Sequence, residues 1–456
     1  MSLRHLAVAA LSTSMLQAQQ PLPKIDTTGK SIRFDFPGML IGVAEYEEGP
    51  TGTTVFYFPR GVKAAVDARG GAPGTVNTDA ARLGYEDHQI QSVVLSGGSW
   101  YGLSAATGVA NAIKAERAKA GEHDFIAGVL AAIIYDVGGR RFSRVTPDDA
   151  LGGAALRSAK AGWFPLGARG AGRYAMQGIY FVNDTTAEAY GRWPHSGQGG
   201  AFRQVGPTKI AVFTVVNALG LIVGRDGNVV RCGRNTPGTP CPPIASVMRD
   251  RLNQPQRLGI HGGAADSAMT PSGNTTLTLV VTNQKLPWWA LNRLAAQVHS
   301  SMSRGIQPFA TQYDGDVLYA VTTDEVENNA LTALDLSTIA SEVAWDAVLA
   351  SVPELPALPS ATRATLSAES RRDLEGVWQF PDGGKLSIGA DLTATFTGTR
   401  RIYFDVGRRY TLTPVGTDRL LVEGKAQDIL QIERVNGSVS LVLNPGPWNQ
   451  RALPSR

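Results

Sequence analysis

The sequence predicts two regions of different fold class: an α/β region as far as residue 352 and a small all-β region over residues 374–456. Strand and helix patterns alternate in the first region, whereas the second holds only short alternating runs of the kind that form antiparallel sheets. Between the two regions, Pro353, Pro356 and Pro359 fall within seven residues. Such spacing interrupts both helices and central strands, so we expect residues 353–373 to be a linker.

The α/β pattern is clearest at the end of the first region. Residues 275–281 form a short β-branched run, which favours a strand. Pro287 then begins a predicted helix, residues 317–321 predict the next strand, and a second helix ends before Pro353. Apolar residues recur every three or four positions in both helices: Leu291, Leu294, Ala295, Val298 and Met302 in the first, and Leu336, Ile339, Ala340, Val343 and Ala347 in the second.

The second region consists of short runs in which apolar and polar residues alternate, separated by turn residues such as Asn436-Gly437. Gly376-Val377-Trp378 opens the set. The later runs are 385–388, 393–397, 410–413, 420–422, 429–432 and 439–443. This pattern predicts a small antiparallel β-barrel or sandwich of about 85 residues. Nothing in it indicates catalysis, so we interpret it as an accessory domain.

The charge balance argues against nucleic acid as a partner. Lys plus Arg number 43 and Asp plus Glu number 39 in 456 residues, which gives a formal net charge of +4. Nucleic-acid-binding domains concentrate basic residues on one face, whereas this excess is slight. Hydrophobic residues make up 43% of the chain and charged residues 18%, which excludes a disordered chain.

The N-terminus has the pattern of a secretory signal peptide. Arg4 and His5 precede the apolar run 6–11, and Ala18 supplies a small residue for cleavage. We therefore expect residues 1–18 to be removed and the mature protein to be secreted or periplasmic. An ordinary amphipathic N-terminus is the alternative, because residues 12–14 break the apolar run. No other segment reaches the ~18 apolar residues of a membrane span, so no membrane association is expected.

Cys232 and Cys241 bracket a turn-rich loop that can bring them together. In an oxidising compartment the two thiols could form a disulfide, and two unpaired thiols are the alternative. Without histidines nearby at a ligand spacing, they make a poor zinc site.

The segment Gly97-Gly98-Ser99-Trp100-Tyr101 does not fit a serine hydrolase. The nucleophile elbow needs glycines two residues before and two residues after the serine. Gly97 meets this requirement and Tyr101 does not. None of the six histidines lies in a recognisable triad context, so we do not expect histidine-based catalysis.

Thr275 is a better candidate for the nucleophile. Gly273-Asn274-Thr275-Thr276 joins a long turn-rich segment to the predicted strand. A threonine hydroxyl is a poor nucleophile unless a base lies beside it. If the bond between Asn274 and Thr275 is cut, Thr275 gains a free α-amine with a pKa of about 7.7–8.0, which suits a general base near neutral pH. On these four residues alone, an ordinary turn-to-strand junction is the alternative.

Asp314-Gly315-Asp316 places two carboxylates between a predicted helix and a predicted strand. Such a pair can hold an ammonium group, orient a hydroxyl or share a proton. A calcium loop would need further oxygen ligands at regular spacing, and residues 317–319 supply none. A plain solvated turn is the alternative.

Several motifs occur in order between residues 30 and 352: VDARGGAPG (66–74), LSGGSWYGL (95–103), IYD (134–136), VNALG (216–220), GNTT (273–276), VHSSMSRGIQPF (298–309) and DGD (314–316). With them the chain resembles the N-terminal-nucleophile peptidases of the DmpA type, and within these the nylon-oligomer (6-aminohexanoate-oligomer) hydrolases. The resemblance implies a four-layer αββα sandwich for residues 19–352. It also implies amide hydrolysis through an acyl-enzyme, with no metal and no cofactor.

The resemblance further implies roles for individual residues. Thr275 is freed by self-cleavage after Asn274 and attacks the amide carbonyl, with its own α-amine as the general base. Asn217 supplies an oxyanion-hole amide. Asp314 and Asp316 orient the nucleophile and tune its amine. Taken singly, Asn217 could equally cap a turn.

For substrate binding, the resemblance implies that Tyr135 lines the pocket, although core packing is its alternative role. The substrate is then either a linear amide oligomer, such as a 6-aminohexanoate chain, or the N-terminus of a short α-, β- or D-peptide. An aminopeptidase would need an acidic residue for the substrate amine, and Glu122 or Asp124 could serve, although a solvated surface position suits both. One departure from the family is Ile179, which occupies the place of a lysine.

The resemblance also implies a homo-oligomer, commonly a tetramer, of two-chain protomers. A third hypothesis, which concerns a different class of function, is a binding protein that keeps the fold without catalysis.

Overall fold

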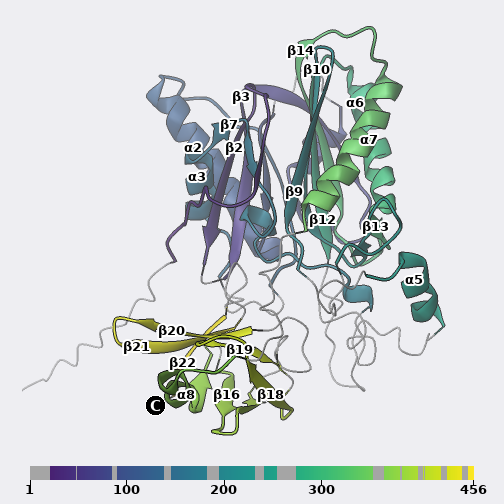
Figure 1. The fold of residues 1–456 in the computed structure, drawn as a ribbon. Coiled ribbons are helices and arrows are strands. Elements are labelled where there is room, and N and C mark those ends of the chain that lie inside the picture. The colour runs from purple at the N-terminus through teal and green to yellow at the C-terminus, as the bar shows by residue number, and fades with distance from the viewer. Residues whose placement is uncertain are drawn as a thin grey trace, which may run out of the picture.

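The structure is a computed structural model that describes residues 21–47, 49–84, 90–137, 145–181, 195–231, 241–253, 274–352, 364–380, 383–398, 404, 406–422, 429–443 and 450–455. It has a mixed α/β part followed at the C-terminus by a closed barrel of eight strands (Figure 1). This confirms the predicted combination of an α/β region with an all-β region. The expected signal peptide, residues 1–18, lies outside the described residues, and so does Cys232.

The α/β part contains a sheet of ten strands among the described residues. The strand that begins at Thr275 lies inside this sheet, parallel to one neighbour and antiparallel to the other. In spatial order, eight of these strands are β4 (Thr75–Val76), β6 (Val129–Ile133), β5 (Ile90–Ser96), β3 (Thr51–Ala68), β14 (Val317–Val326), β12 (Thr275–Gln284), β10 (Thr208–Asn217) and β9 (Gln198–Val205). The other two lie beside them: β2 (Leu40–Tyr46) pairs with β3, and β7 (Lys160–Ala161) pairs with β2.

Strand β3 joins two halves of this sheet, one that contains β2 and β5 and one that contains β14. Its first residues pair with β2 and β5, the register shifts between Tyr57 and Val62, and its last residues pair with β14. Figure 1 shows β2 and β3 on one side of the α/β part and β9, β10, β12 and β14 on the other. Apolar residues from both halves form one cluster, in which the rings of Phe56, Phe164 and Phe213 contact one another.

Helices cover the outer face of each half (Figure 1). Helices α2 (Ser104–Lys119) and α3 (Asp149–Arg157) share an apolar cluster with β2, β3, β5 and β6. Helices α6 (Trp288–Ser301) and α7 (Ala333–Ala350) share another with β10, β12 and β14. Both predicted helices are therefore present, and the residues that predicted them face this cluster.

Strand β12 is buried on both faces. Leu277, Leu279 and Val281 point into the cluster between the two halves, whereas Val280 points toward α6 and α7. The strand also runs three residues beyond the predicted segment, to Gln284. These polar residues stay in the sheet because their side chains are paired: Thr208 Oγ1 donates to Gln284 Oε1 at 2.9 Å, and Asn283 Oδ1 accepts from the Lys209 N–H at 2.7 Å.

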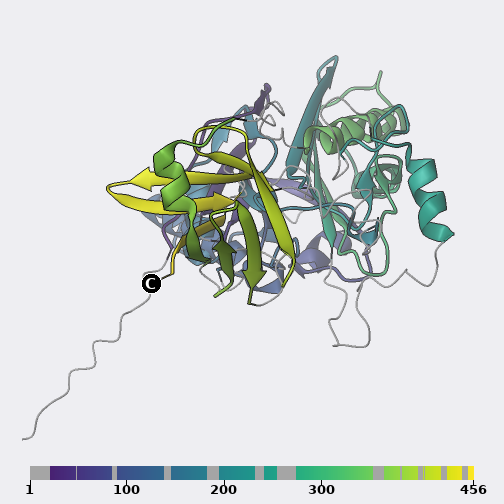
Figure 2. The same ribbon diagram turned by 60° about the horizontal axis from the view of Figure 1, so that its bottom comes forward.

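The C-terminal strands are drawn green to yellow in Figures 1 and 2 and close into an antiparallel barrel. The structure therefore selects a barrel over a sandwich, and it adds a last strand that the sequence pattern did not predict. The strands are β15 (Gly376–Gln379), β16 (Lys385–Ile388), β17 (Thr393–Thr397), β18 (Arg409–Pro414), β19 (Arg419–Val422), β20 (Ile429–Val435), β21 (Ser438–Leu443) and β22 (Gln450–Pro454). Alternate residues, such as Leu386 and Ile388, fill the interior.

Helix α8 (Ala368–Leu374) occupies the end of the segment that we expected to be only a linker. Ser367 caps it by accepting a hydrogen bond from the Ser370 N–H. The Leu374 carbonyl accepts from the Trp378 indole N–H at 2.8 Å, and Leu374 is buried with the barrel interior. The helix therefore packs against the barrel. The three prolines lie upstream of it and do not interrupt it.

Shorter elements complete the described chain. They are β1 (Ser31–Arg33) paired with β8 (Trp163–Pro165), β11 (Leu221–Ile222) paired with β13 (Ile306–Gln307), helices α1 (Thr78–Arg82) and α5 (Ile244–Leu252), and 3-10 turns at Ser99–Leu103, Gly170–Gly172, Ile179–Phe181 and Met302–Arg304. Cys241 is disulfide-bonded. None of the helices in the described ranges is long and apolar enough to cross a membrane.

Candidate active site

Thr275 is the first residue of β12 and lies opposite Asn217, the last residue of β10, in the antiparallel ladder. Both residues are buried, with Thr275 3% and Asn217 1% exposed. The Thr275 hydroxyl donates to the carbonyl oxygen of Asn274 at 2.6 Å. In this uncleaved chain the candidate nucleophile therefore contacts the peptide group that precedes it.

The loop Asp314-Gly315-Asp316 lies beside Thr275 because β14 starts directly after it and runs parallel to β12. In the same register, an isolated bridge pairs Asn274 with Asp314, three residues before the first pair of the ladder, Leu277 with Val317. The Gly315 N–H donates to the Asn274 carbonyl oxygen at 2.6 Å. The expected residues Asn217, Asn274, Thr275, Asp314 and Asp316 are thus brought together from three strands.

Both carboxylates are buried and hydrogen-bonded. Asp316 accepts from the Thr276 N–H with one oxygen and from the Ala310 N–H at 3.0 Å with the other. Asp314 accepts from the Thr311 N–H at 2.9 Å and from the Thr311 hydroxyl at 2.6 Å. The loop is therefore not the solvated turn that its composition alone allows.

Burial changes how this pair titrates. Burial raises the pKa of Asp314, although the hydrogen bonds from Thr311 act in the opposite direction. Burial also raises the pKa of Asp316 well above its usual range, and the negative charge of Asp314 adds to the effect. Two carboxyl groups with raised pKa values can take up or release a proton closer to neutral pH than a free aspartate does.

A third segment, residues 69–72, holds the carboxylate loop in place. The Gly70 N–H donates to the Asp316 carbonyl at 3.3 Å, and the Ala72 N–H donates to the Asp314 carbonyl at 2.9 Å. A Cβ atom on Gly70 would lie 2.3 Å from both the Asp314 carbonyl oxygen and the Asp316 nitrogen. Only glycine permits this close approach, which explains the Gly-Gly pair in this motif.

The side-chain amide of Asn217 is engaged on both sides. Its oxygen accepts from the Met176 N–H at 3.0 Å, and its nitrogen donates to the Tyr135 carbonyl at 2.9 Å. Tyr135 therefore reaches the site through its backbone, and its side chain is half-buried. Asn274 differs from Asn217, because its Nδ2 is buried without a hydrogen-bond partner among the described residues.

Comparison with known proteins identifies the family. The model of peptidase family S58 matches residues 32–355, which is more than half of the chain. The chain belongs to peptidase family S58. This confirms the resemblance that the sequence motifs indicate.

Known proteins that are similar to this chain are of two kinds. The 6-aminohexanoate-oligomer endohydrolases of Paenarthrobacter ureafaciens and of Agromyces sp. (strain KY5R) are each 40% identical over 340 residues, which are 72% of this chain and 88% of the relative. An uncharacterised aminopeptidase of Mycobacterium leprae is 30% identical over 300 residues, which are 61% of this chain and 72% of the relative.

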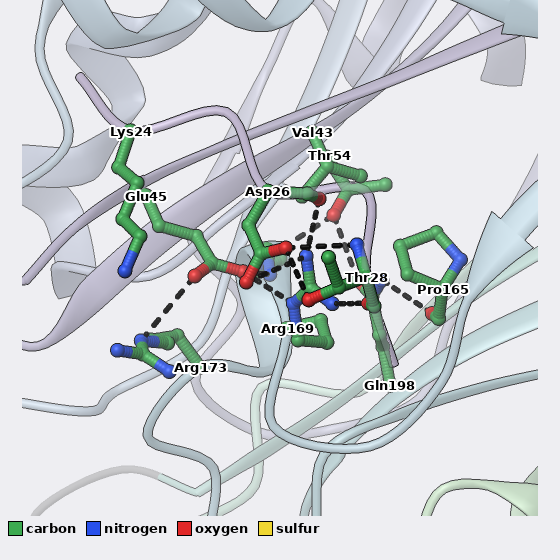
Figure 3. Close-up of polar contacts among 12 residues, drawn as sticks. Lys24, Asp26, Thr28, Val43, Glu45, Thr54, Pro165, Arg169, Arg173 and Gln198 are labelled. Atoms are coloured by element: carbon green, nitrogen blue, oxygen red, sulfur yellow. Dashed lines mark hydrogen bonds and ion pairs between the residues drawn. The ribbon is translucent and has the colours of Figure 1, made fainter. Parts of the chain in front are cut away.

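In this chain a buried ionic cluster holds residues 169–173 (Figure 3). Glu45 is 2% exposed and pairs with Arg169 and Arg173. Its Oε1 also accepts from the Gly170 N–H at 2.8 Å. Met176, whose N–H donates to the Asn217 side chain, follows this segment in the chain.

The same Arg169 holds the described N-terminal segment. Its guanidinium donates to the Thr28 carbonyl at 2.5 Å and to the Asp26 carbonyl, as Figure 3 shows. Thr54 and Gln198 extend the network: the Ala171 N–H donates to Thr54 Oγ1, and Thr54 Oγ1 donates to Gln198 Oε1 at 2.7 Å. A buried carboxylate is tolerated here because it is both paired and hydrogen-bonded.

The serine-containing turn after β5 supports the segment after β6 that carries Tyr135. The Gly98 N–H donates to the Asp136 carboxylate at 2.7 Å, and the Ser99 N–H donates to the Ile134 carbonyl at 2.9 Å. Gly98 has a φ of 87°, in the region that favours glycine. The turn therefore has a structural role next to the site.

Glu122 and Asp124, the residues considered for binding a substrate amine, both lie exposed after α2. Glu122 pairs with Arg117 at 3.3 Å. This agrees with their alternative role as solvated surface residues. No three His, Cys, Asp or Glu side chains within the described ranges are placed to hold a metal ion together, and the side chain of Ile179 is not among the described ones.

Proposed function

We propose that this protein is a self-processing amide hydrolase whose nucleophile is Thr275. The observation that carries the proposal is the position of Thr275 at the start of a buried strand, between Asn217 on one side and Asp314 and Asp316 on the other. Self-cleavage of the bond after Asn274 would convert this residue into an N-terminus. The hydroxyl contact with the Asn274 carbonyl supports that reaction.

In the mature enzyme the free α-amine of Thr275 takes the proton from its own hydroxyl as Oγ bonds to the substrate carbonyl carbon. The same proton then goes to the leaving amine as the carbon–nitrogen bond breaks, and water later hydrolyses the ester. An α-amine of pKa about 7.7–8.0 suits both transfers. The buried pair Asp314 and Asp316 would hold the amine in place and stabilise its protonated form.

Asn217 would stabilise the oxyanion of the substrate. Its amide nitrogen carries two hydrogens, of which one serves Tyr135. The second has no partner among the described residues and is available to bind developing negative charge. Losing one such donor typically costs 10²–10³-fold in rate. The contacts from Met176 and Tyr135 limit the rotation of this amide, which supports the role.

The two chains produced by cleavage would stay together. The second chain would begin with β12, which lies between β10 of the first chain and β14 of its own, and β14 pairs with β3 of the first chain. Separation would break two strand ladders and expose the cluster that contains Leu277 and Leu279. We therefore expect the two chains to co-purify as one protomer.

For the substrate we propose linear amide oligomers of the 6-aminohexanoate type, with Tyr135 lining the pocket. The 40% identity to two 6-aminohexanoate-oligomer endohydrolases supports this choice. Aminopeptidase action on short peptides is the second candidate, supported by the 30% identity to an aminopeptidase. The exposed positions of Glu122 and Asp124 weigh against their use as amine-binding residues.

The two candidates are separated by blocking the substrate amine. Linear 6-aminohexanoate oligomers and short peptides are offered to the purified protein with a free or an acetylated amino end, and products are quantified by chromatography. We expect acetylated oligomers to be cleaved at a rate similar to that of the free ones. Loss of cleavage on acetylation would instead identify an aminopeptidase.

We also propose a four-layer αββα arrangement for the hydrolase part, export of the protein, and assembly into a homo-oligomer of two-chain protomers. The helices on the outer face of each half-sheet support the first proposal (Figure 1). Light scattering of the purified protein and N-terminal sequencing of the exported form test the other two.

A further inference from the structure

We propose that the backbone N–H of Gly315 is the oxyanion donor for self-cleavage. The inference rests on the proposed self-processing at Thr275 and adds a catalytic group to it. The Asn274 carbonyl is the group that the Thr275 hydroxyl would attack. That oxygen accepts two hydrogen bonds in the uncleaved chain, from the Thr275 hydroxyl and from the Gly315 N–H, both at 2.6 Å.

Only the Gly315 donor keeps its hydrogen during the reaction. As Thr275 Oγ bonds to the Asn274 carbonyl carbon, its proton leaves and ends on the Thr275 nitrogen when the peptide bond breaks. The product is an ester between Asn274 and the Thr275 side chain, with a free amine. Between these events the carbonyl oxygen carries negative charge, and a fixed N–H already within hydrogen-bond distance stabilises it without rearrangement.

The position of this N–H is set by strand pairing and by the lack of a side chain. Asn274 and Asp314 pair in an isolated parallel bridge, and the Asn274 N–H donates to the Tyr313 carbonyl at 3.2 Å. A Cβ atom on Gly315 would lie 2.6 Å from Thr275 Oγ1 and 2.7 Å from the Ala72 carbonyl oxygen. Any larger residue would push the nucleophile or the loop away.

Asn217 does not occupy this role in the uncleaved chain. Its side chain bonds to the Met176 N–H and the Tyr135 carbonyl, and no hydrogen bond among the described residues joins it to the Asn274 carbonyl oxygen. We therefore assign different oxyanion donors to the two reactions: the Gly315 N–H in self-cleavage and the Asn217 amide in substrate hydrolysis.

The test replaces the Gly315 N–H with an ester oxygen by incorporating glycolic acid at position 315 during cell-free synthesis of the full chain. This change removes the donor and adds no atoms near Thr275. It also weakens the Asp314 carbonyl as an acceptor for the Ala72 N–H. The matched control is lactic acid at position 72, which removes that bond completely and leaves the Gly315 N–H intact. Appearance of the fragment that begins at Thr275 is followed on denaturing gels.

We expect the ester at 315 to slow self-cleavage by about 10²–10³-fold, with the control within about threefold of wild type. Equal rates for the 315 ester and wild type would overturn the inference and leave the nucleophile assignment standing. An uncut wild-type chain would instead remove the proposed function itself.

A second measurement covers the case in which the ester prevents folding. In uncut Thr275→Ala, the Asn274 carbonyl is labelled with carbon-13 and its infrared stretch is compared with that of a labelled Leu279 carbonyl in β12. A strong bond from Gly315 predicts a lower frequency for Asn274. An equal or higher frequency would contradict the inference.

Discussion

The sheet around Thr275 and the C-terminal barrel are both closely packed β-structures, but they bury different kinds of side chain. At the start of β12 the buried residues include two aspartates, two asparagines and a threonine. In the described part of the barrel the buried residues are nearly all apolar, with Ser370 and Ser440 as the polar ones. Burying a charged or polar group costs free energy unless the group is paired. Buried polar groups are therefore expected mainly where they have a functional role.

The charged residues of the barrel lie at its surface instead. Arg434 pairs with Glu369, Asp373 and Asp418, all of them partly exposed. Exposed ion pairs of this kind contribute about 0–1 kcal/mol. The contrast between the two regions provides matched variants to test where catalysis takes place.

The largest expected difference is between two aspartates. Asp316→Asn should slow self-cleavage and turnover by about 10²–10⁴-fold, because the variant loses its charge and turns an amide N–H₂ toward the N–H of Thr276 or Ala310. Asp418→Asn changes a carboxylate that is 41% exposed and should leave both rates within about twofold. Gel assays of processing and rates on a linear amide oligomer measure both. Full activity in Asp316→Asn would remove the carboxylate pair from the mechanism.

The next comparison is between two buried leucines. Leu279→Ala in β12 and Leu430→Ala in β20 each remove a fully buried side chain and should each cost about 2–5 kcal/mol of unfolding free energy. Their consequences should differ. Leu279→Ala is expected to reduce processing because it loosens the strand that carries Thr275, whereas Leu430→Ala should destabilise the barrel alone.

Calorimetry beside the gel assay checks this prediction. If Leu430→Ala reduced processing as much as Leu279→Ala does, the barrel would take part in building the site.

The smallest expected effect is a shift in pH dependence. The Thr311 hydroxyl favours the ionised form of Asp314, so Thr311→Val should raise the pKa of that carboxyl further. The fall in activity on acidification should therefore begin at a higher pH than in wild type. Thr311→Ser keeps the hydroxyl and should match wild type, and a shift toward lower pH in Thr311→Val would contradict the account.

The local elements of this fold could be predicted from sequence because their signals are local. The β-branched run after Asn274 and the apolar spacing from Leu291 to Met302 indicate a strand and a helix within a few residues of their observed ends. The polar end of β12 could not be predicted, because Gln284 is kept in the sheet by a distant partner, Thr208. Helix α8 was missed for the same reason, since Leu374 is buried by the barrel.

The candidate site likewise contains some residues that the sequence predicts and others that it does not. The residues Thr275, Asp314 and Asp316 carry a chemical signal of their own. The groups that hold them were not predicted: the Met176 N–H on Asn217, the Thr311 hydroxyl on Asp314 and the close approach of Gly70. These contacts join segments far apart in the chain. The Gly-Gly pair at 70–71 was the available signal, because adjacent glycines within a motif indicate close approach of backbones.

The most direct test of the central claim is the intact mass of the purified wild-type protein beside Thr275→Ala, with a denaturing gel of each. The account predicts two chains for wild type, the second running from Thr275 to Arg456, and one uncut chain for the variant. A wild-type protein that stays in one piece would have no free amine on Thr275, and the proposed mechanism would be wrong.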